Sequence, residues 1–194
     1  ELMSVPINIV SPQSNKPVIG IIQDTLLGCH KITNKSVFLT RPEMNNIRMC
    51  LKIKPYAIPN PIIKKPEILY SGKQIFELIL PTDFCFKRIY GNNSEDVVEI
   101  VNGQILNGQL CKKSLGTSEG GIIHLLWLQY GPSTAKEFIS NIQYIVNEWL
   151  KTESFSIGAM DIFVDKNTKK QVDETISTAK NKVEQILAVL KNNK

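Results

Sequence analysis

The residues best suited to chemistry in this sequence are two adjacent lysines, Lys112 and Lys113. Two neighbouring ammonium groups can attract the phosphates of a nucleotide or a nucleic acid, because clustered positive charge focuses the field that such anions meet. The same pair can also be two solvated lysines at the end of a strand, with no binding role. The pair taken by itself leaves both interpretations open.

Two further polar groups precede apolar runs. Gln23 and Asp24 are expected on a short helix, where they can orient neighbouring loops by hydrogen bonding or where Asp24 can pair with a local lysine. Upstream, Gln13, Ser14 and Asn15 stand next to a proline. Small polar side chains in that setting favour a turn held by side-chain-to-backbone hydrogen bonds.

Other chemistries lack the residues that they need. The four cysteines lie far apart without a Cys-x-x-Cys pair, and the two histidines complete no metal-ligand spacing, so we expect reduced thiols and no zinc. His124 has no accompanying nucleophile or carboxylate motif and is expected in the core. The Gly72-Lys73 pair is not a phosphate-binding loop, because Glu67 stands where that loop needs glycine and Gln74 where it needs serine or threonine.

The composition is that of a folded, basic protein. A chain of 194 residues with 42% hydrophobic residues can form one domain or two small ones. Its uncharged apolar runs are too short to span a membrane, so we expect no transmembrane segment. A net charge of +5 favours polyanions only modestly. The chain starts without Met and stops in a charged helical pattern, so we expect it to be a segment of a longer protein.

The elements that must position the N-terminal polar residues are short. A helix is expected over residues 17–28, with Gly28 as its C-terminal cap. Residues 41–70 hold five of the ten prolines and are expected to be mostly ordered loop. Ser71 and Gln74 form a capping-box pattern, which predicts another short helix after them.

The C-terminal half predicts a hairpin and two longer helices. Asn102-Gly103 lies between two β-rich runs within residues 97–112, and Asn-Gly suits a hairpin turn that needs positive φ at both central residues. Thr134 and Glu137 are capping candidates for a helix that reaches residue 150 with a broad apolar face.

The last segment predicts a helix with a narrow apolar stripe. Thr168 and Gln171 are its cap candidates. The stripe repeats at alternating spacings of four and three, as in a coiled coil, through Val172, Ile176, Ala179, Val183, Ile186 and Leu190. Such a stripe normally packs on another helix. Its partner can be a second copy, or the second arm of a helical hairpin in the rest of the chain, and the second alternative is favoured by the resemblance below.

Several blocks of the sequence resemble, in the same order, the segment that follows the catalytic aspartate loop in the largest subunit of multisubunit DNA-dependent RNA polymerases of the eukaryotic type. The resemblance extends over nearly the whole chain. Its blocks are residues 11–17, 20–28, 71–74, 112–124, 147–150 and 155–158.

This resemblance implies an α+β fold in two parts. Residues 1–150 would be the pore domain, with short helices and a β-hairpin or small sheet, and residues 151–194 would begin the funnel domain with a long helix. In these polymerases the pore and funnel form the secondary channel, through which nucleotides enter and backtracked RNA leaves. Lys112 and Lys113 match the family's lysine pair near the nucleotide entry. The resemblance places four other residues near the active centre: Gln13, Asn15, Gln23 and Asp24.

The resemblance also implies a metal ion and partner molecules that lie outside this chain. The family's three magnesium-binding aspartates belong to an Asn-Ala-Asp-Phe-Asp-Gly-Asp string, which does not occur in this sequence. The Mg²⁺ of the full enzyme is therefore expected on residues outside the chain, and the chain alone should not catalyse nucleotidyl transfer. The implied partners are the second-largest and other polymerase subunits, template DNA, RNA and a transcript-cleavage factor.

Two departures from the family pattern indicate a divergent polymerase. Residues 158–161 read Gly-Ala-Met-Asp where the family has Gly-Ile-Gly-Asp, and the family's Trp-Asp-Gly is missing around residues 53–58. With 20 lysines against 3 arginines, these departures favour a large cytoplasmic DNA virus as the source, and thus the virion and host cytoplasm. A cellular enzyme would instead work in the nucleus.

Two functions of other classes stay open. One is a free-standing basic nucleic-acid-binding module that uses residues 166–194, although the aromatic residues form no cluster for base stacking. The other is a coiled-coil scaffold dimer. A molar mass that rises with protein concentration to that of a stable dimer would support the scaffold.

Overall fold

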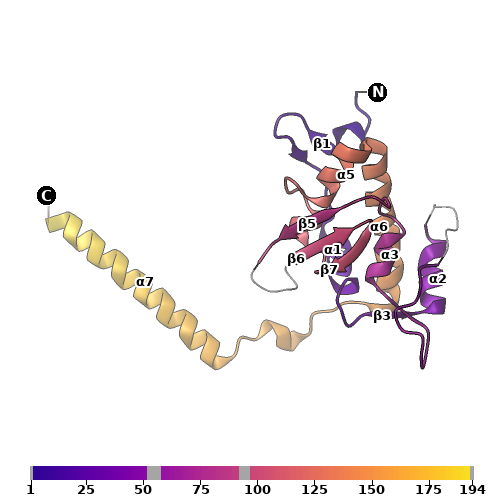
Figure 1. The fold of residues 1–194 in the computed structure, drawn as a ribbon. Coiled ribbons are helices and arrows are strands. Elements are labelled where there is room, and N and C mark those ends of the chain that lie inside the picture. The colour runs from indigo at the N-terminus through magenta and orange to yellow at the C-terminus, as the bar shows by residue number, and fades with distance from the viewer. Residues whose placement is uncertain (1, 52–57, 92–96, 193–194) are drawn as a thin grey trace. The chain divides into compact units, whose positions relative to one another are not determined.

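The computed structural model describes residues 2–51, 58–91 and 97–192, and the chain divides into two compact units, Glu1–Ser154 and Phe155–Lys194. The first unit combines helices with three small antiparallel sheets, which confirms the α+β prediction (Figure 1). Its elements are η1 (Ile7–Ile9), β1 (Val10–Ser11), β2 (Lys16–Pro17), α1 (Gln23–Ile32), β3 (Phe38–Thr40), α2 (Arg41–Met49), β4 (Leu69–Ser71), α3 (Lys73–Glu77), β5 (Phe86–Ile89), β6 (Val97–Val101), β7 (Gln104–Asn107), α4 (Lys112–Leu115), α5 (Ile122–Tyr130) and α6 (Pro132–Glu153). The second unit contains η3 (Ala159–Ile162) and α7 (Lys166–Asn192).

Helix α6 is the centre of the first unit, and α1, α2 and α5 pack against it. The predicted broad apolar face is confirmed, because these residues are buried: Ala135, Phe138, Ile142, Ile145, Val146 and Trp149. The predicted cap is wrong. The helix already begins at Pro132, after Gly131 with φ 89°, and the Thr134 hydroxyl donates to the Tyr130 carbonyl (3.0 Å) instead of capping.

Helix α1 differs from its prediction at both ends. Residues 18–22 are not helical, and Gly28, the predicted cap, lies inside a helix that continues to Ile32. A Cβ built on Gly28 would lie 2.2 Å from Val146 Cγ1 of α6. The glycine therefore serves close helix packing, and no cap is needed at that position.

Helix α2 lies in the segment predicted to be loop. Glu43 Oε2 accepts hydrogen bonds from the Thr40 amide and hydroxyl, both at 2.8 Å, and Pro42 occupies the first turn. Proline is tolerated there because the first helical amides have no intrahelical acceptor. The loop prediction is wrong for residues 41–49, because it took account of the number of prolines and not of their positions. The missing Trp-Asp-Gly falls at residues 53–58, of which 53–57 lie outside the described residues.

The Asn102-Gly103 turn is confirmed, and a short helix does follow Ser71, but its N-cap is Gly72 and Ser71 is not the cap. Gln74 Oε1 accepts from the Ser71 amide (3.1 Å), and Ser71 Oγ accepts from the amide of Lys73 (3.3 Å), at the start of α3. Asn102 and Gly103 have φ values of 52° and 75° and join β6 to β7 in an antiparallel hairpin. Strand β5 pairs with β6 and completes a three-stranded sheet in the order β5-β6-β7.

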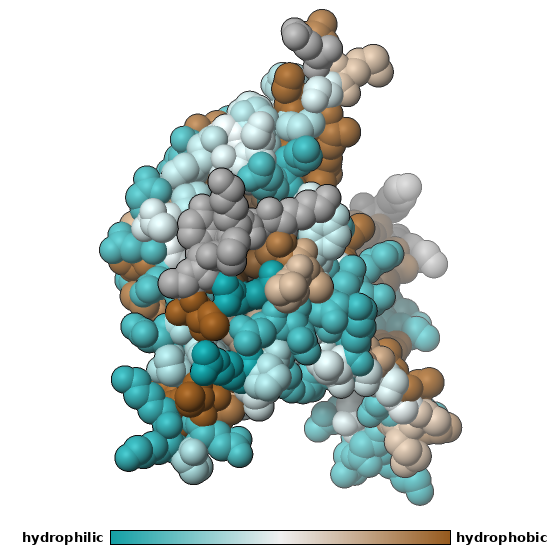
Figure 2. Space-filling model, turned by 90° about the vertical axis from the view of Figure 1, so that its right-hand side faces the viewer, coloured by the Kyte–Doolittle hydropathy of each residue, from teal (hydrophilic) through white to brown (hydrophobic). Residues whose placement is uncertain are grey.

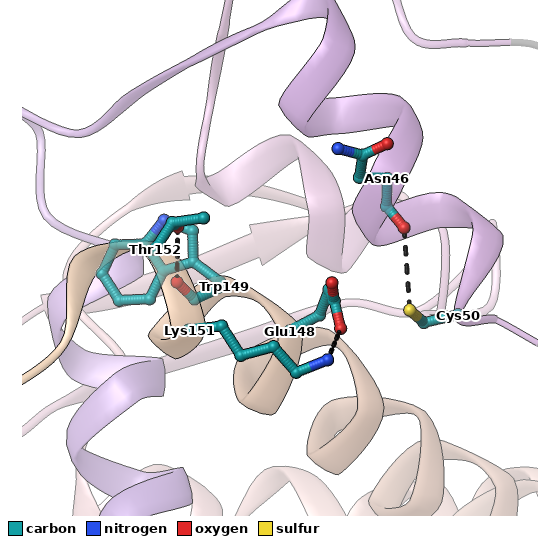
Figure 3. A network of polar contacts seen from close by, with 6 residues as sticks. All are labelled: Asn46, Cys50, Glu148, Trp149, Lys151 and Thr152. Carbon is teal, nitrogen blue, oxygen red and sulfur yellow. Dashed lines mark hydrogen bonds and ion pairs between the residues drawn. The ribbon is translucent and has the colours of Figure 1, made fainter.

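Polar residues of α6 lie near Cys50 at the end of α2 (Figure 3). Lys151 pairs with Glu148 on α6, and the Cys50 thiol donates to the Asn46 carbonyl (3.6 Å) at the end of α2. Burial, followed by the Glu148 charge, raises the pKa of Cys50. Cys50 therefore stays protonated near neutral pH and is no thiolate nucleophile.

On one face of the molecule the apolar side chains lie apart from one another. The face seen in Figure 2 is mainly hydrophilic, with apolar side chains in separate patches. Scattered patches of this kind are ordinary on folded proteins.

Helix α7 carries the predicted stripe, but its cap lies elsewhere. Asp165 Oδ2 accepts from the Asn167 amide (3.3 Å), so Thr168 and Gln171 lie inside the helix. The stripe is exposed along its length, with 48% of Ile176 and 60% of Ile186 accessible. Within the second unit nothing among the described residues covers it.

We expect the chain to remain a monomer of 21.9 kDa at micromolar concentration. Ala179 occupies a central position of the α7 stripe and contributes little buried area to a dimer. The flanking positions, with Lys182 and Leu187 among them, offer no opposite charges across a parallel pair. Light scattering over a hundredfold concentration range is the measurement. A stable dimer that Val183→Asp dissociates would instead support the scaffold function.

Candidate functional site

Lys112 and Lys113 form the first turn of α4, so they do not end a strand. Ser114 fixes this turn, because its hydroxyl accepts from the Cys111 amide (2.9 Å) and donates to the Cys111 carbonyl (2.8 Å). Both lysine side chains are exposed. The Lys113 ammonium donates to the Tyr90 carbonyl (3.2 Å).

Arg88 joins the two lysines as a third cation. Its Nη1 donates to the Glu119 carbonyl (2.6 Å), and its guanidinium carbon lies 5.7 Å from the centre of the Tyr90 ring. Tyr90 thus contacts both Arg88 and Lys113. Burial, opposed in part by Arg88, raises the pKa of Tyr90 to about 12, so its phenol adds no negative charge.

These cations are not neutralised within the described part of the chain. There, no carboxylate lies within ion-pair distance of Lys112, Lys113 or Arg88. Uncompensated charges of one sign raise the local potential and the local concentration of anions. The arrangement is therefore suited to attract phosphate, and Arg88 is the member that sequence patterns missed.

Gln23 and Asp24 lie at the start of α1, with exposed side chains. The structure connects this helix end to α4, because the Ile21 amide donates to the Leu115 carbonyl (2.9 Å). A Cβ on Gly20 would lie 2.8 Å from the Gly116 carbonyl carbon, so the two segments are in close contact. Among the described residues no lysine lies within ion-pair distance of Asp24.

Gln13, Ser14 and Asn15 form the exposed turn between β1 and β2, as predicted. The Asn15 amide donates to the Ser11 carbonyl (2.9 Å), and the Gln13 amide donates to Ser11 Oγ (3.3 Å). Asn15 has φ 47°, a value that asparagine tolerates better than most residues. No hydrogen bond of the described residues joins this turn to the lysine pair.

His124 is buried in α5, as predicted for a core histidine. The Gly120 amide donates to its Nδ1 (3.0 Å) and closes the turn before the helix. Its Nε2 is buried and meets no hydrogen-bond partner among the described residues. In the described part of the chain, His124 positions no nucleophile.

Comparison with known proteins places these features in a family. Residues 8–162 match the family described as RNA polymerase Rpb1, domain 3. This chain belongs to that family. The chain is also 33% identical, over 196 aligned residues, to DNA-directed RNA polymerase II subunit RPB1-B of Trypanosoma brucei brucei. That alignment covers 99% of the chain and 11% of the relative, so the chain spans about a tenth of the relative's length.

Membership of the Rpb1 domain 3 family confirms the resemblance found in the sequence. The predicted viral source gains no support, because the relative belongs to a eukaryote. Within the described residues, no three His, Cys, Asp or Glu side chains cluster as metal ligands. No described helix is both long and apolar enough to cross a membrane.

Proposed function

We propose that this chain is part of the largest subunit of a DNA-directed RNA polymerase, with the pore domain at residues 1–150 and the beginning of the funnel domain at residues 151–194. Membership of the Rpb1 domain 3 family carries this proposal. The match to a polymerase II subunit over 99% of the chain supports it independently.

Within the polymerase, we place Lys112 and Lys113 on the path of entering nucleotides and of backtracked RNA. Support comes from their exposure and from a third exposed cation, Arg88, which has no carboxylate partner among the described residues. Their role is electrostatic: they raise the local concentration of triphosphate without making or breaking a bond. Gln23 and Asp24 belong to the same surface, through the contact of residues 20–21 with residues 115–116. Gln13 and Asn15 shape a turn that faces the active centre in this proposal.

Phosphoryl chemistry in the full enzyme needs Mg²⁺ to neutralise charge on the reacting phosphates. We assign that ion to residues outside this chain, in line with the resemblance. The partners are then the second-largest and other subunits, template DNA, RNA and a transcript-cleavage factor. Because the matched relative is eukaryotic, the nucleus is the proposed location.

The proposal predicts that the full-length parent subunit co-purifies with a second-largest polymerase subunit and that the complex extends RNA on a DNA template. An affinity tag on the parent and a primer-extension assay measure this. Omission of Mg²⁺ should abolish extension and leave the complex assembled. A parent that purifies without polymerase subunits would contradict the proposed function.

A further inference from the structure

Tyr90 contacts two cations of the candidate site through two different groups. It follows β5 directly, two residues after Arg88, and alternate residues of an extended chain point to the same side. The guanidinium carbon of Arg88 lies 5.7 Å from the centre of the Tyr90 ring. The Tyr90 carbonyl accepts from the Lys113 ammonium (3.2 Å). One residue therefore contacts cations from two separate elements, β5 and α4.

The hydroxyl group of Tyr90 takes no part in these contacts. It is buried and meets no hydrogen-bond partner among the described residues, and burial is the main cause that raises the Tyr90 pKa to about 12. A buried, neutral hydroxyl neither reaches a nucleotide at the surface nor adds charge to the site. Every residue has a backbone carbonyl, so the identity of this side chain matters through its ring.

Arg88 is held at two points, and the ring is one of them. The other is the turn before α5, where Arg88 Nη1 donates to the Glu119 carbonyl (2.6 Å). An aromatic face attracts a guanidinium group by its negative potential. Without the ring, a long side chain held only at one end regains rotamer freedom. Arg88 and Lys113 also carry like charges, which favour separation when the side chains are free.

The fixed position of both cations matters for the proposed function. Charges of one sign that stay together raise the local potential at one place, whereas mobile charges spread it over a larger surface. We propose that Tyr90 is a positioning residue for nucleotide attraction, whose aromatic ring holds the Arg88 guanidinium on the same surface as Lys113. This inference rests on the proposed function, because it presupposes that these cations attract nucleotides.

Substitutions of Tyr90 in the full-length parent subunit, within the assembled polymerase, test this role by single-nucleotide extension. Tyr90→Leu keeps an apolar side chain but removes the ring. It should raise the nucleotide concentration needed for half-maximal elongation about threefold and leave the maximal rate within about twofold. Tyr90→Phe keeps the ring and removes only the unpartnered hydroxyl, so it should match the wild type.

Substitutions of Arg88 identify the residue through which Tyr90 acts. Tyr90→Leu added to Arg88→Ala should raise the nucleotide requirement no further, since no guanidinium group remains to be held. The effect of Tyr90→Leu should also shrink at high salt, because it depends on an exposed charge. Arg88→Lys keeps the charge but lacks the planar group that stacks on the ring. It should raise the requirement by a similar factor, and it tests the proposal even if Tyr90→Leu fails to assemble.

Tyr130→Leu is the matched control. Tyr130 is partly buried against the same core as Tyr90, and its ring packs edge-on against Phe84, with centroids 6.2 Å apart. This substitution removes a contact between two uncharged rings. It should leave the nucleotide requirement at the wild-type value.

The outcomes separate this inference from the proposed function. If Lys112→Ala/Lys113→Ala raises the nucleotide requirement but Tyr90→Leu and Arg88→Lys do not, the positioning role alone is overturned. The same holds if Tyr90→Phe or Tyr130→Leu is as defective as Tyr90→Leu, or if Tyr90→Leu lowers only the maximal rate. A polymerase in which none of these variants raises the requirement contradicts the proposed role of the lysine pair itself.

Discussion

Replacement of Gly72 by alanine should destabilise the first unit by about 3 kcal/mol or more, because the added methyl group has no space. A Cβ at this position would lie 2.0 Å from the Ile32 carbonyl oxygen. That oxygen belongs to the backbone at the end of α1, so it cannot rotate away as the end of a side chain can. The φ of Gly72 is −57°, which any residue can adopt, so the effect comes from contact and not from backbone strain.

Urea unfolding followed by circular dichroism measures this effect, and Gly28→Ala is the matched control. The Cβ of Gly28→Ala would meet Val146 Cγ1, a side-chain atom, at 2.2 Å. Val146→Ala should therefore restore part of the stability lost in Gly28→Ala, whereas Ile32→Ala should not rescue Gly72→Ala, since the obstructing oxygen remains. A Gly72→Ala protein within about 0.5 kcal/mol of the wild type would contradict the packing argument.

The sequence predicted best the elements whose conformation depends on adjacent residues. Asn102-Gly103 specifies a hairpin because its two positive φ values are a local property. The apolar face of α6 follows from the helical period, and each of its predicted members is buried or packed against the core. Neither result depends on which other segment lies nearby.

Long-range packing explains the predictions that were wrong. Gly28 looked like a helix cap, but its partner is Val146, a residue of α6 that no local pattern connects to it. The 18–22 segment was predicted to be helical, yet the Ile21 amide bonds to Leu115 of α4. In each case a tertiary contact decided the local structure, as helix propensity is weak enough to permit.

The candidate site also combines residues that a local sequence pattern reveals with a residue that only the folded structure reveals. Lys112 and Lys113 were predicted from a contiguous motif. Arg88 was missed because β5 carries it, more than twenty residues before the lysine pair. Its near neighbour Tyr90 meets Lys113 only in the folded chain. A cation on a strand gives no signal in a single sequence that distinguishes it from a solvated side chain.

In the assembled polymerase, Lys112→Ala/Lys113→Ala should raise the nucleotide concentration needed for half-maximal elongation about five- to tenfold, which corresponds to about 1–1.4 kcal/mol. The reason is that two of the three exposed cations are removed, and triphosphate loses their attraction. The maximal elongation rate should change less, because the lysines contact no reacting atom in this proposal. Single-nucleotide extension over a range of nucleotide concentrations measures both quantities.

Lys64→Ala/Lys65→Ala is the matched control, since it removes two adjacent, exposed lysines from another surface of the same unit. The difference between the two double variants should shrink as salt rises from about 0.05 to 0.5 M, because ions screen the attraction between exposed charges. Arg88→Ala added to Lys112→Ala/Lys113→Ala should raise the nucleotide requirement further. If the control raises the nucleotide requirement equally, or if the effect of Lys112→Ala/Lys113→Ala is independent of salt, the lysine pair does not act by electrostatic attraction of nucleotides.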